Sequence, residues 1–158
     1  MKKDIKIAIA TLIFATTCFG QTATVQSRVI LKTQTDSLNY ALGVANGDGI
    51  KNNYFKDKPI EECISVFMKY LDAGFAIDNQ FVKPVSTNKY ASIIEIAYKV
   101  GTTLKTQVST GLMGNPSLKI DLYLIKKGLE DGMRNNSSLM SPEKAQRYLH
   151  ETMTKISH

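Results

Sequence analysis

The feature that most constrains the fold of this chain is a face of small residues that recurs in two expected helices. Residues 40–55 read YALGVANGDGIKNNYF, with apolar residues at helical spacing but glycine at 43, 47 and 49. Because each glycine inside a helix costs about 1 kcal/mol relative to alanine, the pattern indicates close approach of a neighbouring helix. The residues of this face are spaced three or four apart, and they are Tyr40, Gly43, Gly47, Ile50 and Tyr54. The second such face, in a helix expected from about 88 to 109, comprises Ile94, Ala97, Gly101, Leu104 and Val108.

Both helices belong to a longer internal repeat. The stretch GDGIK at 47–51 matches GTTLK at 101–105, and FMKYLDAGF at 67–75 matches IKKGLEDGM at 125–133. The sequence therefore predicts an all-α fold of about five helices. We expect a duplicated helical hairpin, followed by a C-terminal helix, with bounds of 37–75, 90–133 and 141–156.

The small faces predict a helix-packing seam. Its expected members are Tyr40, Gly43, Gly47, Ile50, Ile94, Ala97, Gly101 and Leu104. Gly49 lies off this face, so we expect no packing role for it. Asp36 or Ser37 is expected to cap the first helix.

The first twenty residues are typical of a secretory signal peptide. Lys2, Lys3 and Lys6 precede the short apolar run IAIATLIF, and the small-residue pattern CFG predicts cleavage after Gly20. We therefore expect a secreted or periplasmic protein with a flexible lead-in at 21–36. Two alternatives are lipoprotein processing at Cys18 and an uncleaved membrane anchor. After cleavage, no stable membrane span is expected.

Charge and cysteine content narrow the function classes. The net charge is +6, and cleavage would lower it to +4 because three lysines and Asp4 are removed. Without a long basic run, the charge does not favour nucleic-acid binding. Cys63 would be the one remaining cysteine, which excludes an internal disulfide; we expect it to be a small buried apolar residue.

The sequence predicts no catalytic, metal or cofactor site. His150 and His158 are too few for a metal centre, and GDGIKN lacks the third glycine of a dinucleotide-binding motif. Two groups of neighbouring acidic and basic residues are expected to be exposed helix charges and not catalytic acid–base pairs. They are Asp72 with Lys69, and Glu130-Asp131 with Lys126-Lys127. An alternative to plain packing is a groove in which tyrosine rings and methionines grip apolar peptide; the methionines are Met68, Met113, Met133 and Met153.

DSLNYALGVANGDGIKNNYF resembles the opening helix of the N-terminal domain of secreted FKBP-type peptidyl-prolyl isomerases, including macrophage infectivity potentiator proteins. That helix typically begins Asp-x-x-Ser-Tyr-x-x-Gly; Asp36, Tyr40 and Gly43 match, and Asn39 replaces the serine. SLKIDLYLIKKGLEDGM and LMSPEKAQRYLHETM are similar to the second and third helices of that domain. The resemblance covers about residues 36 to 158, without the catalytic domain that follows in the family.

The resemblance implies a helical dimerisation and chaperone-like module of the cell envelope, associated with protein folding. In the family, two chains interlace; here we expect self-association or an intramolecular pseudo-dimer, and unfolded polypeptides as clients. Alternatives are a peptidyl-prolyl cis-trans isomerase that retains activity, and an accessory subunit of a full-length isomerase.

Overall fold

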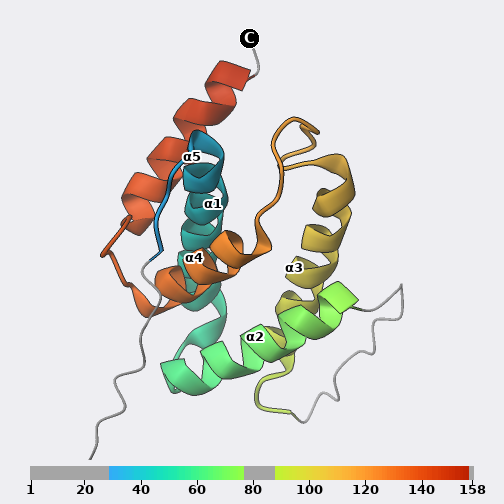
Figure 1. The fold of residues 1–158 in the computed structure, drawn as a ribbon. Helices are drawn as coiled ribbons and strands as arrows, with labels where there is room; N and C mark the ends of the chain where they lie inside the picture. Colours follow the sequence, from blue (N-terminus) through green and yellow to red (C-terminus); the bar gives the residue numbers. More distant parts are fainter. Residues whose placement is uncertain (1–28, 77–87, 157–158) are drawn as a thin grey trace, which may run out of the picture.

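The computed structural model describes residues 29–76 and 88–156, which form an all-α fold (Figure 1). No β-strand forms within those residues, so the expected fold class is confirmed. The elements are α1 (Gln34–Ile50), the π-helix η1 (Lys51–Phe55), α2 (Ile60–Ala76), α3 (Ala91–Thr110), α4 (Leu122–Arg134) and α5 (Pro142–Ile156).

Helix α1 begins earlier than the sequence suggested. Thr33, and not Asp36 or Ser37, is the N-cap. The Thr33 side chain accepts a hydrogen bond from the Asp36 backbone N–H at 3.0 Å, and Asp36 Oδ2 accepts one from the Thr33 N–H at 3.1 Å. This reciprocal capping box satisfies two N–H groups that have no partner within the helix, so the helix extends back to Gln34.

The helices pair across the two halves of the chain. Helix α1 packs against α4, which crosses it, while α2 packs across α3 (Figure 1). Within the described residues, neither α1 with α2 nor α3 with α4 is a main packing pair. The expected hairpins therefore describe how the chain is connected, but their two helices are not each other's main neighbours.

Glycines bring α1 and α4 into backbone contact. A Cβ atom at Gly43 would lie only 2.8 Å from the backbone nitrogen of Leu129, and one at Gly47 would collide with the Leu129 carbonyl oxygen. From the other side, Cβ atoms at Gly128 and Gly132 would collide with carbonyl oxygens of α1. Close approach of the two backbones is therefore possible only without these side chains.

The α2–α3 pair repeats these contacts at matching positions. Gly101 faces the Leu71 carbonyl as Gly47 faces that of Leu129, and these residues correspond in the sequence repeat. In the same way, Gly74 faces the Tyr98 carbonyl as Gly132 faces that of Val44. The two pairs thus use one mode of packing, as two related units would, while the duplication itself stays a prediction.

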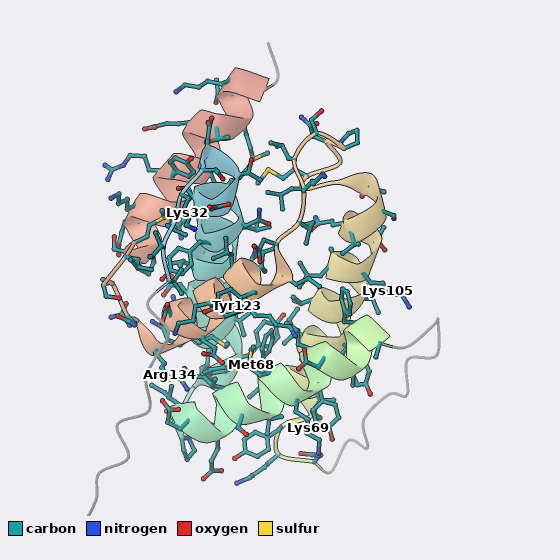
Figure 2. All side chains as sticks on the ribbon, viewed as in Figure 1. Lys32, Met68, Lys69, Lys105, Tyr123 and Arg134 are labelled. Carbon is teal, nitrogen blue, oxygen red and sulfur yellow. The ribbon has the colours of Figure 1, made fainter. Side chains whose placement is uncertain are left out.

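Two ion pairs join α2 to α4. Lys126 pairs with Asp72. Arg134, labelled in Figure 2 at the end of α4, donates from Nε and Nη2 to Glu61 in the first turn of α2, at 3.1 and 2.9 Å. Asp72 and Lys69 are both exposed, as expected, although the partner of Asp72 is Lys126. Lys69 lies instead over the ring of Tyr70, with Nζ 5.5 Å from the ring centroid.

Asn39 ties the start of α4 to α1. Its amide nitrogen donates to the carbonyls of Thr35 and Lys119, at 2.9 and 3.0 Å, and its Oδ1 accepts from the Asp121 backbone N–H at 3.0 Å. Asp121 is also the N-cap of α4. The buried amide thus satisfies donor and acceptor groups at the point where α4 begins.

Helix α5 covers the outer side of α1, and no other described helix covers α3 in this way. Ala41 and Val44 of α1 pack in a cluster with Met140 and Ala145. At the positions of α3 that match Ala41 and Ala45, the chain carries Glu95 and Lys99, which form an ion pair at 3.0 Å. Because that side of α3 is charged, it does not require a covering helix.

The N-terminal expectations are mostly untested. The signal peptide, its cleavage site after Gly20 and the lipoprotein alternative lie outside the described residues. Of the expected lead-in, Val29 is buried in the cluster between α1, α4 and α5. Within 29–76 and 88–156, no helix combines the length and apolar character needed to cross a membrane.

Candidate functional site: a groove between the crossed helix pairs

All the residues expected to form the helix-packing seam are buried. Tyr40, Gly43, Gly47 and Ile50 lie on α1, and Ile94, Ala97, Gly101 and Leu104 lie on α3. The α1 glycines face α4, and Gly101 faces α2. A Cβ atom at Gly49 would meet nothing within 4 Å, so this glycine takes no part in helix packing.

Sequence reasoning missed the glycines on the opposing helices. Gly128 and Gly132 of α4 lie directly against α1, and Gly74 of α2 lies against α3. Gly128 and Gly132 are four residues apart, the same spacing as Gly43 and Gly47. That shared spacing was the available signal, because residues four apart lie on one face of a helix.

A polar cluster around the buried side chains of Tyr40 and Asp131 fastens α1 to the end of α4. The Tyr40 hydroxyl donates to Asp131 Oδ2 at 2.8 Å, while Lys127 Nζ and Asn136 Nδ2 donate to Oδ1 at 3.1 and 2.9 Å. Asp131 is 2% exposed, so its expected place among exposed helix charges is wrong. Three donors compensate for its burial, and this makes the cluster a structural clamp between the helices.

The environment of Tyr40 makes stability sensitive to alkaline pH. Burial, followed by the hydrogen bond to Asp131, raises the pKa of Tyr40 well above its usual value. Above about pH 10, the Tyr40 phenol ionises in the unfolded state but stays neutral in the folded state. The contribution of Tyr40 to the free energy of unfolding is therefore lost progressively as pH rises above about 10.

We expect Tyr40→Phe to destabilise the protein most at neutral pH. The difference in unfolding free energy between wild type and variant should narrow above pH 10, by at most about 1.4 kcal/mol per pH unit. Urea unfolding at several pH values from 7 to 11 measures this difference. A difference that is constant across the range would contradict the role assigned to this phenol.

An open groove lies between α1, α3 and α4. We call it the central groove; its volume is about 340 Å³. Its apolar lining consists of Leu42, Ile96, Val100, Leu104, Ile125 and Leu129. Its polar lining consists of Asn46, Lys99, Thr103 and Gln107. Leu42 and Ile96 occupy matching positions of the repeat, so the groove lies where the two halves of the chain face each other.

The central groove is not the one that the tyrosine and methionine content suggested. No tyrosine or methionine is among the described residues that line it. Met133 is instead fully buried in the core, and Tyr54 lines a smaller neighbouring cavity of about 180 Å³. Branched aliphatic side chains therefore provide the apolar surface that is open to a ligand.

The groups with reactive potential lie apart from this groove. Cys63 is fully buried, as expected, and burial raises the pKa of its thiol. His150 is exposed on α5, and His158 lies outside the described residues. No cluster of His, Cys, Asp and Glu suited to a metal ion occurs in the described part of the chain. The lining of the central groove offers a ligand mainly apolar contact.

Comparison of the chain with protein-family models, curated proteins and solved structures finds no match.

Proposed function

We propose that this protein is a non-catalytic helical module of the cell envelope that holds unfolded polypeptides. The observation that carries the proposal is the central groove, in which half-buried Leu42, Ile96 and Val100 remain open to solvent above buried Ile125 and Leu129. An apolar segment entering the groove would cover these side chains, and burial of apolar surface contributes about 25 cal/mol per Å².

The groove has the chemistry needed for clients of varied sequence. Its apolar contacts have no fixed direction, since the hydrophobic effect scales with area and not with orientation. Asn46, Thr103 and Gln107 place neutral polar groups beside the apolar surface. Such groups can hydrogen-bond to the backbone of a bound segment, whatever its side chains are.

The crossed helix pairs support the idea of an intramolecular pseudo-dimer. Contacts such as Gly47 on Leu129 and Gly101 on Leu71 join the two halves of a single chain. One chain would thereby provide what the resembled family builds from two.

We expect Thr103→Trp to weaken client holding by obstructing the groove. Thr103 is exposed and lines the groove, so an indole here should occupy space needed by a client without disturbing the core. Suppression of aggregation of a chemically unfolded test protein measures holding, and we expect at least a three-fold loss. The matched control is Thr102→Trp, at an exposed neighbour that does not line the groove. Equal suppression by both variants would show that the groove is not where clients bind.

The enzymatic alternative predicts a different result. A retained isomerase would accelerate cis-trans exchange of a proline-containing peptide, whereas a holding module would leave the uncatalysed rate unchanged. Acceleration by the purified protein would overturn our proposal.

A further inference from the structure

We infer that the central groove selects short extended apolar segments that carry an acidic residue beside the apolar stretch, with Lys99 setting this preference. The inference rests on the proposed function and adds the class of segment that the groove accepts. It depends on the length of the groove, its lining and the position of its charge.

The length of the groove suits about five extended residues. Its α3 wall runs from Ile96 to Gln107, eleven helical steps that span about 17 Å. An extended chain rises about 3.3 Å per residue, so about five residues fit along this wall. A volume of about 340 Å³ is near the lower end of small-ligand pockets, which agrees with a short segment.

The apolar lining comes from all three helices, while most of the polar lining lies on one of them. Leu42 of α1 and Ile125 and Leu129 of α4 face the apolar side chains of α3. On α3, Lys99, Thr103 and Gln107 recur at intervals of four residues, so they form one row along the helix. A bound segment would thus have apolar surface on one side and this polar row on the other.

Lys99 gives the groove its charge. Among the described residues that line the groove, it alone is charged. Its Nζ pairs with Glu95 on the same helix at 3.0 Å, but the two side chains are 66% and 42% exposed. Exposed pairs of this kind contribute little to stability, so a carboxylate of a bound segment can replace Glu95 at small cost. The net charge, which is +6 for the full sequence and +4 after the expected cleavage, favours the same sign of ligand.

The experiment compares two fluorescent peptides by anisotropy at low salt. Both contain the core Leu-Ile-Ala-Leu-Val; one is flanked by aspartates and the other by lysines. We expect the aspartate peptide to bind wild type at least five-fold more tightly, and Lys99→Glu to reverse the order. The preference should shrink in 0.5 M salt, where charges are screened beyond a few ångströms.

The matched control is Lys69→Glu, which changes the net charge equally but lies on α2, outside the groove. It should retain the preference for the aspartate peptide. Loss of the preference in both variants would mean that net charge decides binding, which would overturn the assignment to Lys99.

The outcomes separate this inference from the function on which it rests. Equal affinity of wild type for both peptides would overturn the charge preference while leaving client holding intact. Failure to bind either peptide, in a protein that still suppresses aggregation, would place clients elsewhere and overturn the inference. Failure in both assays would remove the proposed function as well.

Discussion

The double variant Gly47→Leu, Gly101→Leu should either show no cooperative thermal transition or have a melting temperature lowered by about 20 °C or more. Each leucine side chain would meet a backbone carbonyl of the facing helix, Leu129 for position 47 and Leu71 for position 101. A backbone cannot rotate away as a side chain does, so overpacking at each site should cost about 3 kcal/mol or more. Because the sites lie in different helix pairs, the costs should add and approach the whole stability of a small domain.

Gly49→Leu is the control for this experiment. The position is in the same helix, but a Cβ atom there meets nothing within 4 Å. Leucine also has a higher helix propensity than glycine, so the melting temperature should stay equal or rise. If the double variant does not fold, single Gly47→Ala and Gly101→Ala variants provide a smaller perturbation of the same kind. A double variant that melted no sooner than wild type would contradict the packing described here.

We expect Asp131→Ala to cost about 3 kcal/mol of unfolding free energy, the second largest effect. The substitution leaves the buried Tyr40 hydroxyl without its acceptor and removes the anchor for Lys127 and Asn136. Removing one partner of a buried, hydrogen-bonded charge is costly because the other groups lose their compensation. Urea denaturation at pH 7 measures the loss.

A double-mutant cycle with Tyr40→Phe tests whether the two groups act together. We expect a coupling energy of about 1 kcal/mol or more between them, since each substitution removes the same hydrogen bond. The control is Glu130→Ala, beside Asp131 but half-buried and paired with Arg134 at 3.4 Å. Its loss should stay below about 1 kcal/mol. An equal loss at both positions would indicate that Asp131 is no more than another surface charge.

The helices were predictable because their signals are local. The apolar spacing at Ile64, Phe67 and Leu71 indicated α2, and Ser141-Pro142-Glu143 indicated the start of α5. The early start of α1 was missed although Thr33 and Asp36 stand at capping-box spacing. The usual capping box has Glu or Gln three residues after the N-cap. Because position 36 is an aspartate, the sequence suggested Asp36 only as a possible N-cap.

The pairing of the helices could not be predicted from spacing alone. Gly43 and Gly47 mark a face that needs a close neighbour, but any helix with a complementary face satisfies that need. Asp131 illustrates the same limit, because its partner Tyr40 is 91 residues away in sequence. The central groove was missed for a related reason, since it arises where α1 and α3 leave space between them.

The crossed pairing has a consequence for the order in which the chain can fold. Helix α1 packs on α4, and α2 packs on α3. During synthesis, the α2–α3 pair therefore cannot be completed before residue 110 has been added, and the α1–α4 pair cannot be completed before residue 134 has been added. Contacts this distant along the chain slow folding and leave apolar surface uncovered during synthesis. The incomplete chain is therefore prone to aggregation until both helix pairs have formed.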